Sequence, residues 1–401
     1  MVQSVDSPKT FPIPDFDAAE HSGRVLDYIL AEIAAAGGAI SFARFMDLAL
    51  YAPGLGYYRA GTRKFGPDGD FMTAPELSPL FSCCLAHQCR EILAALPGSS
   101  ILELGAGSGI MAADLLQELQ TLNALPEQYA ILELSGELRE RQRQTLVARI
   151  PALMERVVWL NALPQPGFRG VILGNEVLDA LPVERFRITA QGPRRLVVAW
   201  TETGLACVEG EDDPAVTAMV AQIEADIGWR LPEGYTSEYV LRLAEWLAAL
   251  AQPLSAGALL FIDYGYPRRA YYHPERTTGT LLCHYRHRAH DDPLFLPGLQ
   301  DITANVDFTA VADAALAVGL NVAGYTTQNY FLFGCGLMEL LAEDEEKASL
   351  AMSMRYLEQA RQVKLLTLPG EMGDRFQAIA LTRNLETPLR GFAFRDERNR
   401  L

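Results

Sequence analysis

The clearest signal of fold in this chain is Ser100-Ile-Leu-Glu-Leu-Gly-Ala-Gly-Ser-Gly-Ile110. Its apolar run Ile101–Leu104 predicts a short buried strand, which three alternating glycines end at once. A helix-like run, Ile110–Leu119, follows. A strand, a glycine turn and a helix in this order let the backbone approach a nucleotide-like ligand closely. The spacing G-x-G-x-G departs from a dinucleotide fingerprint, which requires a third glycine where this chain has Ile110.

The composition predicts a large folded protein. The chain has 401 residues, of which 49% are hydrophobic and 21% are charged. These fractions allow a sizeable core and argue against a disordered chain. The net charge of −16 argues against nucleic acid as a partner, because phosphate contacts need a basic surface. The same charge suits a basic protein segment as substrate, or it simply keeps the protein soluble.

Cysteine usage and the N-terminal segment point to the compartment. The six cysteines are scattered and none forms a C-x-x-C pair, so we expect reduced thiols and no metal site. Met1–Asp17 lacks the apolar core of a secretory signal and the Arg-rich pattern of a transit peptide. No uninterrupted apolar run is long enough to span a bilayer. We therefore expect a cytoplasmic protein without membrane insertion.

Short apolar strands alternate with helices from residue 100 onward. This alternation predicts an α/β fold with a mostly parallel, doubly wound sheet and helices on both faces. The expected strands are Ile101–Leu104, Gln128–Leu134, Val157–Leu160, Gly170–Gly174, Ala258–Asp263, Asn321–Gln328 and Phe376–Arg383. The expected helices, besides Ile110–Leu119, are His21–Ala36, Phe42–Leu50, Leu80–Leu96, Gly136–Arg149, Ser237–Ala251 and Asp307–Val318.

Two stretches interrupt this alternation. Residues 183–235 contain three strand-like runs, which predict a small antiparallel insert. Residues 265–305 are long, polar and rich in Tyr, His and Arg, which favours a functional loop. The expected domains are an N-terminal helical region (1–98) packing on a main domain (99–385) that carries both inserts, and a C-terminal tail (386–401).

Two strand ends offer contacts for a nucleotide-like ligand. Glu133 ends the second expected strand, 28 residues after Gly105. A carboxylate at that point can accept hydrogen bonds from both hydroxyls of a ribose. The alternative is a solvated charge at the end of a strand. An adenine contact would fall at the end of the third strand, at Leu160 and Asn161.

The segment after the fourth strand carries the candidate catalytic groups. Asn175 and Glu176 follow that strand at the carboxyl edge of the sheet, where open α/β folds place their reaction centres. On a helical turn, Glu176 and Asp179 would share one face and could hold a cationic nitrogen between them. The alternative is structural, with Asn175 capping a helix and Asp179 in its first turns.

Several segments together resemble one known family, the MidA-like methyltransferases of class I, which use S-adenosylmethionine and include a mitochondrial arginine methyltransferase that assists complex I assembly. The matching segments keep the family's order and cover about residues 20 to 385. The family's glycine motif often reads G-P-G-R-G, and aromatic residues often stand where this chain has Val177-Leu178. The segments are Gly69–Glu76, Glu103–Gly109, Gly174–Pro182, Asp263–Gly265, His284–His287 and Asp301–Phe308.

The resemblance implies a Rossmann-like methyltransferase domain with S-adenosyl-L-methionine as cofactor. It further implies methyl transfer to an arginine nitrogen of a protein, with a link to respiratory complex assembly. Separately, the strand-rich insert at 185–208 offers a surface for a partner, which leaves a homodimer open. The implied cofactor-binding residues are Glu103, Gly105, Gly107, Gly109, Glu133, Leu160, Asn161, Asn175, Asp70, Thr73 and Pro75. The implied catalytic residues are Glu176, Asp179, Asn175 and Glu76, with His287 as an acceptor of the released proton.

Alternatives of other classes remain open at the level of sequence. The fold could be retained in an assembly or scaffold protein, or it could serve a methyltransferase that acts on a small molecule. The run Arg286, His287, His290 and Asp291 lacks the helical frame of a metal site, so a substrate lid is favoured there. An NAD-dependent dehydrogenase fits poorly, because Ile110 replaces the third glycine.

Overall fold

The computed structural model describes residues 11–60, 73–346 and 353–401. Their contacts divide the chain into two compact units. The first, here called the insert unit, combines Met1–Phe71, Asp179–Arg242 and Tyr266–Asp307. The second, here called the sheet unit, combines the ranges Met72–Leu178, Leu243–Gly265 and Phe308–Leu401.

This division differs from the expected domains. Both inserts group with the first 71 residues, whereas α3 (Ala74–Leu77) and α4 (Pro79–Ala95) belong to the sheet unit. The reason is packing, because Phe81 and Ile92 of α4 are fully buried in the same apolar core as the strands. The C-terminal tail also belongs to the sheet unit.

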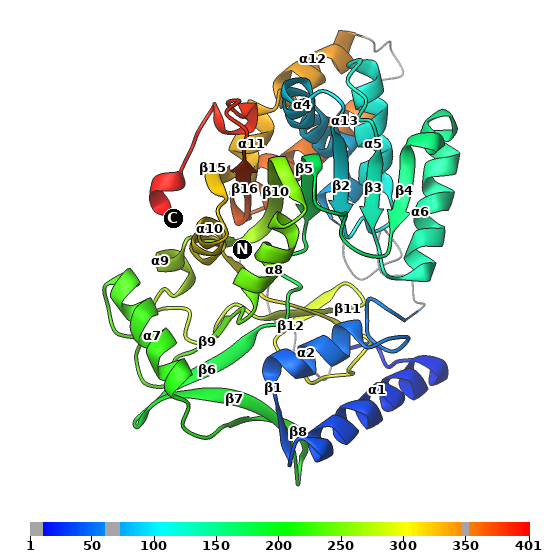
Figure 1. The fold of residues 1–401 in the computed structure, drawn as a ribbon. Helices are drawn as coiled ribbons and strands as arrows, with labels where there is room; N and C mark the ends of the chain where they lie inside the picture. The colour runs from blue at the N-terminus through cyan, green and yellow to red at the C-terminus, as the bar shows by residue number, and fades with distance from the viewer. Residues whose placement is uncertain (1–10, 61–72, 347–352) are drawn as a thin grey trace. The chain divides into compact units, whose positions relative to one another are not determined.

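The large sheet has the strand order β15-β16-β10-β5-β2-β3-β4. Its strands β4, β3, β2, β5 and β10 pair in parallel, and only β16 of this path is antiparallel to both of its neighbours. The mostly parallel α/β sheet predicted from the sequence is thereby confirmed (Figure 1). The strands are β2 (Ser100–Leu104), β3 (Tyr129–Leu132), β4 (Val157–Leu160), β5 (Phe168–Asn175), β10 (Leu254–Tyr266), β15 (Asn321–Thr327) and β16 (Phe376–Arg383).

The strand order reverses between β2 and β5. From β2 the chain moves to β3 and β4, and it returns on the other side of β2 with β5. In open α/β sheets, ligands bind outside the carboxyl ends of the strands at this switch point. The glycine turn follows β2 and Asn175 ends β5, so both predicted motifs lie at the switch point.

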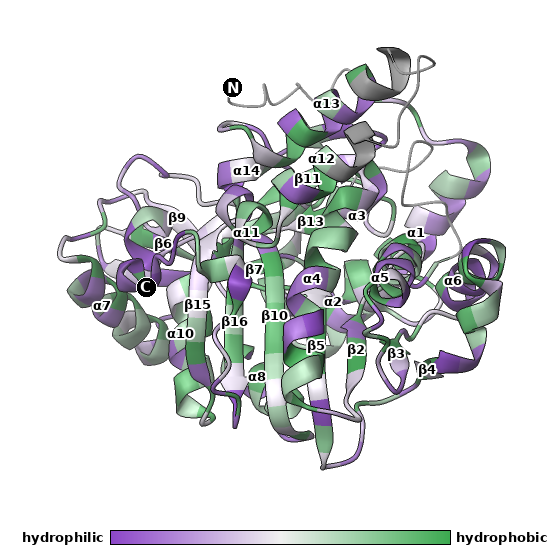
Figure 2. Ribbon diagram, turned by 90° about the horizontal axis from the view of Figure 1, so that it is seen from above, coloured by the Kyte–Doolittle hydropathy of each residue, from purple (hydrophilic) through white to green (hydrophobic). Residues whose placement is uncertain are grey.

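Helices cover the sheet and bury its apolar strands. Ile101 and Leu102 of β2 are fully buried, as expected for a central parallel strand covered on both faces. Figure 2 shows the hydrophobic colour along β10 of the same sheet. The helices of the sheet unit, besides α3 and α4, are α5 (Ile110–Thr121), α6 (Gly136–Arg149), α8 (Leu243–Ala251), α10 (Phe308–Ala317), α11 (Gln328–Gly334), α12 (Leu337–Glu346), α13 (Ser353–Thr367) and α14 (Met372–Arg375).

One predicted helix is wrong in its first half. The expected helix Ser237–Ala251 begins only at Leu243, and Thr236–Tyr239 forms strand β9 instead. Ser237 and Glu238 are fully buried and pair with β6, so tertiary pairing overrides the local helical pattern.

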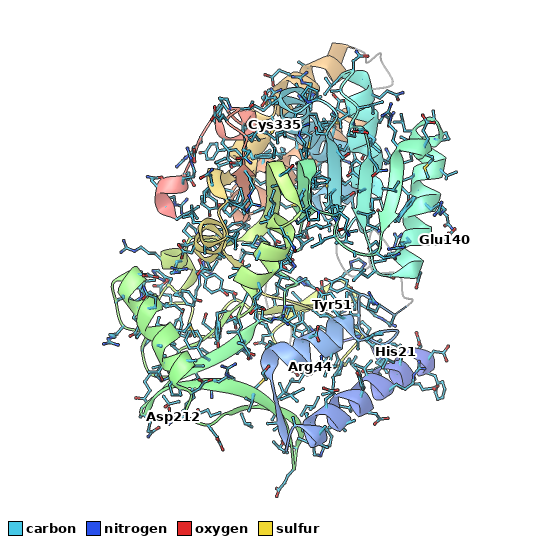
Figure 3. The ribbon with its side chains drawn as sticks, viewed as in Figure 1. His21, Arg44, Tyr51, Glu140, Asp212 and Cys335 are labelled. Atoms are coloured by element: carbon cyan, nitrogen blue, oxygen red, sulfur yellow. The ribbon has the colours of Figure 1, made fainter. Side chains whose placement is uncertain are left out.

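The insert unit is built on an antiparallel sheet of order β1-β7-β6-β9, with β8 paired to β7. The predicted antiparallel insert is confirmed. The stretch expected to be a long polar loop holds a second sheet, β12-β11-β13. Figure 3 shows Arg44 and Tyr51 on α2 of this unit. Its elements are α1 (Phe16–Ala35), β1 (Ala39–Ser41), α2 (Phe42–Tyr51), β6 (Glu184–Thr189), β7 (Gly192–Thr201), β8 (Gly204–Glu209), α7 (Pro214–Ile227), α9 (Arg268–Tyr271), β11 (Leu282–Tyr285), β12 (Arg288–His290), β13 (Asp301–Thr303) and β14 (Val306–Asp307).

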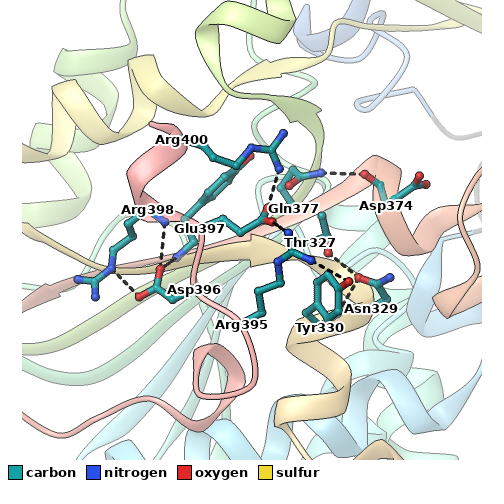
Figure 4. A network of polar contacts seen from close by, with 11 residues as sticks. Thr327, Asn329, Tyr330, Asp374, Gln377, Arg395, Asp396, Glu397, Arg398 and Arg400 are labelled. Atoms are coloured by element: carbon teal, nitrogen blue, oxygen red, sulfur yellow. Dashed lines mark hydrogen bonds and ion pairs between the residues drawn. The ribbon is translucent and has the colours of Figure 1, made fainter.

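The C-terminal residues close the edge of the large sheet at β15. The backbone N–H of Glu397 donates to the carbonyl of Tyr325 at 2.6 Å. The Glu397 carboxylate pairs with Arg395 and Arg400, each at 2.6 Å, as Figure 4 shows. Covering an edge strand removes a row of unpaired backbone groups that could pair with another chain.

Among the residues described, no helix is apolar over a length that could cross a bilayer. Within the same residues, no group of three or more His, Cys, Asp or Glu side chains is placed to hold a metal ion.

Candidate cofactor and catalytic site

The glycine turn after β2 has a backbone that favours glycine at each alternate position. Gly105, Gly107 and Gly109 have φ values of 63°, 52° and 84°, all in the left-handed region. Gly109 is also the N-cap of α5, so the turn leads into the positive end of a helix dipole. A Cβ at Gly109 would lie 3.1 Å from the Cα of Gln142 on α6. The turn therefore exposes backbone and packs closely against α6.

The predicted segment before α4 reaches the glycine turn through Glu76. The Ser108 hydroxyl donates a hydrogen bond to the Glu76 carboxylate. Glu76 lies on α3, whose N-cap is Thr73 and whose first turn contains the buried Pro75. Of the predicted residues in this segment, Asp70 lies outside the described residues.

Glu133 follows β3 directly and has a fixed carboxylate. Its Oε1 accepts a hydrogen bond from the Ser135 backbone N–H at 2.8 Å, and its Oε2 accepts one from Gln142 Nε2 at 3.2 Å. A carboxylate has about four lone-pair sites, so it retains capacity for a ligand. Leu134, next in the chain, is 59% exposed and adds apolar surface beside Glu133.

Arg139 ties together the carboxyl ends of β3 and β4. Its Nε donates to the Glu133 carbonyl at 2.6 Å, and its Nη2 donates to the Leu160 carbonyl at 2.5 Å. The Leu160 side chain is half-buried and Asn161 is exposed. The predicted adenine contacts thus lie at the same edge of the sheet as Glu133.

Glu103 lies inside the sheet rather than on the glycine turn. The residue is buried, and its Oε2 accepts a hydrogen bond from the Tyr129 hydroxyl at 2.8 Å. Burial raises the pKa of Glu103 from 4.5 to about 7, while the Tyr129 hydrogen bond opposes the shift and the charge of Glu133 adds to it. Its carboxylate therefore contacts Tyr129 in the core, and its cofactor contact stays a prediction from the sequence.

The segment after β5 is not helical, which corrects the predicted helical face of Glu176 and Asp179. Glu176 has a φ of 52°, and its backbone N–H donates to the Ile262 carbonyl at 2.9 Å. The next backbone N–H groups, of Val177 and Leu178, donate to Asp263 instead of starting a helix. Asn175 is therefore not a helix cap.

Asn175 and Glu176 contact each other at the end of β5. Asn175 Nδ2 donates to Glu176 Oε1 at 3.0 Å. Asn175 Oδ1 is buried and has no hydrogen-bond partner among the described residues. A buried acceptor without a partner is costly, so this atom suits a donor supplied by a ligand.

Two predicted catalytic residues belong to the insert unit. Asp179 is buried, and its carbonyl accepts a hydrogen bond from the Ala304 N–H at 3.0 Å. His287 is exposed in the turn between β11 and β12, where Arg286 and His287 have φ values of 48° and 62°. Left-handed φ at both turn residues is typical of a two-residue hairpin, although glycine or asparagine is usual there.

A parallel sheet with a glycine turn after β2, a carboxylate after β3 and polar groups after β5 defines a Rossmann-like methyltransferase of class I. Comparisons with known proteins agree. Residues 84–326 match the family described as "Putative S-adenosyl-L-methionine-dependent methyltransferase", and the chain belongs to this family.

Similar proteins are known both from curated sequences and from crystals. The human protein arginine methyltransferase NDUFAF7, mitochondrial, is 28% identical, with 86% of this chain and 80% of that protein covered. Its Drosophila melanogaster homologue is 27% identical, with 94% and 89% covered. A Burkholderia thailandensis protein described as a "likely methyl transferase", bound to S-adenosyl-homocysteine, is 42% identical, with a TM-score of 0.92 and 98% and 100% of the two chains covered.

The cofactor is S-adenosylmethionine, and the residues of the sheet unit fit it. The unpartnered Asn175 Oδ1 suits a cationic ammonium group, and Glu133 keeps acceptor capacity for ribose hydroxyls. The exposed Leu134 suits an aromatic ring, and the N-terminus of α5 suits a carboxylate. All of these groups lie at the carboxyl edge of the large sheet.

Three residues that shape this site are not among the predicted ones. Gln142 and Arg139 lie on α6, a mostly polar helix whose sequence gives no sign of contacts with strand ends. Asp263 stands in a segment that resembles the family, but its acceptor role depends on Val177 and Leu178, which lie far away in the sequence.

Proposed function

We propose that this enzyme transfers a methyl group from S-adenosylmethionine to an arginine side chain of a protein. The observation that carries the proposal is the fixed Glu176 carboxylate at the switch point of the sheet. Its backbone is held by the Ile262 carbonyl and its side chain is contacted by Asn175. The curated relatives named as protein arginine methyltransferases support the same acceptor.

Methyl transfer to arginine requires the protein to align a weak nucleophile with the methyl group. When bound, the cofactor supplies an electrophilic methyl group on its sulfonium. A guanidinium is a poor nucleophile because its charge is delocalised and its pKa exceeds about 12. In the proposal, Glu176 accepts an N–H of the guanidinium, which localises the positive charge and frees electron density on the other nitrogen. Glu176 is also assigned as first acceptor of the proton released on methylation.

The remaining predicted residues enter the proposal in supporting roles. We assign the ribose hydroxyls to Glu133, backbone contacts to the glycine turn, and the cofactor's ammonium group to Asn175. Glu76 supports the glycine turn through Ser108. Asp179 and His287, which belong to the insert unit, stay predictions from the sequence.

The partner and the location stay predictions. A basic, arginine-containing protein segment suits the net charge of −16. A homodimer rests only on the strand-rich insert as a surface for a partner, and a link to respiratory complex assembly rests on the resemblance. The cytoplasmic expectation stands beside curated relatives that are named as mitochondrial.

The test uses purified protein, cofactor with a labelled methyl group, and an extract of cells that lack the gene. The expected result is a labelled protein band that yields methylarginine on hydrolysis. Glu176→Gln is expected to retain S-adenosylhomocysteine binding and lose the label. The matched control Glu140→Gln changes an exposed carboxylate on α6 (Figure 3) and should keep full transfer. Label found only in small molecules, or only on other amino acids, would overturn the arginine assignment.

A further inference from the structure

One amide side chain, that of Gln142, connects three strand ends of the sheet unit. Its Nε2 donates to the Gly107 carbonyl at 3.2 Å and to Glu133 Oε2 at 3.2 Å. Its Oε1 accepts the indole N–H of Trp159 at 2.9 Å. Gln142 is fully buried on α6. The glycine turn after β2, the carboxylate after β3 and the Trp159 side chain of β4 therefore share one partner.

The orientation of this amide is determined by chemistry. An indole N–H can only donate, so it must face Oε1. A carbonyl and a carboxylate can only accept, so both must face Nε2. All polar atoms of the Gln142 side chain are thus used in one orientation. A glutamate at this position would place an acceptor against two acceptors.

We propose that Gln142 is a positioning residue for the ribose of the cofactor, acting through Glu133. Ser135 holds one oxygen of Glu133 and Gln142 holds the other, so the plane of the carboxylate is fixed. The lone pairs that remain then point in one direction, which is what simultaneous contact with two vicinal hydroxyls requires. By also binding the Gly107 carbonyl, Gln142 keeps the glycine turn in register with Glu133. The inference rests on the proposed ribose role of Glu133 and is independent of the methyl acceptor.

The experiment measures ligand binding rather than turnover. Calorimetry gives the affinities of the purified full-length protein for S-adenosylhomocysteine and for its analogue without the ribose 3′-hydroxyl. For Gln142→Met we expect the affinity for S-adenosylhomocysteine to fall about tenfold to a hundredfold. The preference for the complete ligand over the 3′-deoxy analogue should shrink at the same time, because a carboxylate that only Ser135 still holds no longer has a fixed plane for contact with both hydroxyls.

The controls separate positioning from a general loss of structure. Gln144→Met changes an exposed residue of the same helix and should leave both affinities unchanged. Trp159→Phe keeps an aromatic ring but removes the indole N–H that orients the amide, so it should shift the preference in the same direction by a few-fold. This variant tests the proposal if Gln142→Met fails to fold. Wild-type binding in Gln142→Met and Trp159→Phe, or an equal loss of affinity for both ligands, would overturn the proposal. A failure of the arginine assignment would leave these binding results untouched.

Discussion

Asp263 Oδ2 lies 2.8 Å from the backbone nitrogen of Leu178 and accepts its hydrogen bond. The same oxygen accepts the N–H of Val177 at 3.1 Å, and Oδ1 accepts that of Tyr264 at 2.9 Å. Asp263 is fully buried in the last third of β10. A single carboxylate on a neighbouring strand thus fixes the segment that follows β5, and with it the backbone of Glu176.

Replacement of Asp263 by asparagine should loosen this segment. An amide has one acceptor oxygen, so at least one of the buried N–H groups loses its partner, at a cost of about 1–3 kcal/mol. We expect urea unfolding to show this loss, and methyl transfer to fall more than S-adenosylhomocysteine affinity does. The control Asp212→Asn changes a side chain that is 79% exposed and should alter neither quantity. Unchanged unfolding of Asp263→Asn would show that the carboxylate does not hold the segment.

Because Glu176 has a left-handed backbone, two substitutions can distinguish the strain of its backbone from the chemical role of its carboxylate. A residue with a Cβ is strained at a φ of 52°, whereas glycine is not. Glu176→Gly should therefore raise the free energy of unfolding by about 1 kcal/mol, and Glu176→Gln should leave it unchanged. Both variants are expected to lose methyl transfer. Retained transfer in the glycine variant would remove the carboxylate from the mechanism.

The buried Glu103 should make stability depend on pH. Its pKa is raised from 4.5 in the unfolded chain to about 7 in the fold, so the folded protein binds a proton that the unfolded chain has lost between these values. The free energy of unfolding should fall as pH rises from 4.5 to 7, by about 3 kcal/mol from this group. Denaturant titrations at pH 4 and pH 8 give the free energies of unfolding of the wild type and of Glu103→Gln. The variant should gain stability relative to the wild type as pH rises from 4 to 8.

Tyr129→Phe provides the internal check on that prediction. The Tyr129 hydroxyl stabilises the charged form of Glu103, so its removal should raise the pKa further and extend the loss of stability to higher pH. If the difference between wild type and Glu103→Gln is the same at pH 4 and pH 8, the group does not titrate as argued.

The sequence predicts the sheet well because its strands are locally marked. Ile101–Leu104 and the other buried strands are short apolar runs bounded by turn residues. The ends of each expected strand lie within a few residues of those of the observed strand. Strand β9 escapes prediction because Thr236–Tyr239 is stabilised by pairing with β6, about 50 residues earlier, and carries no alternating pattern of its own.

The candidate site also has parts that the sequence predicts and parts that it does not. The positions of the glycine turn and of Glu133 can be predicted, because they follow from the strand ends and the spacing between them. The helix expected after Asn175 does not form, since Asp263 captures the N–H groups that would start it. The role of Gln142 likewise depends on contacts with Gly107 and Trp159. No local sequence pattern on α6 predicts these contacts.

Gly109 belongs to the glycine turn of the candidate cofactor site and packs against α6. Its replacement by alanine tests whether this packing supports ligand binding. An alanine there must adopt a φ of 84° and place its Cβ 3.1 Å from the Cα of Gln142. We expect a loss of about 1–3 kcal/mol of stability and weaker S-adenosylhomocysteine binding, because α6 must move away from the turn. Gly136→Ala is the matched control, since a Cβ at this first residue of α6 meets nothing within 4 Å. That variant should be neutral or more stable by about 0.4–1 kcal/mol, with unchanged binding. Equal behaviour of the two alanine variants in calorimetry and urea unfolding would refute the close packing of α6 on the glycine turn.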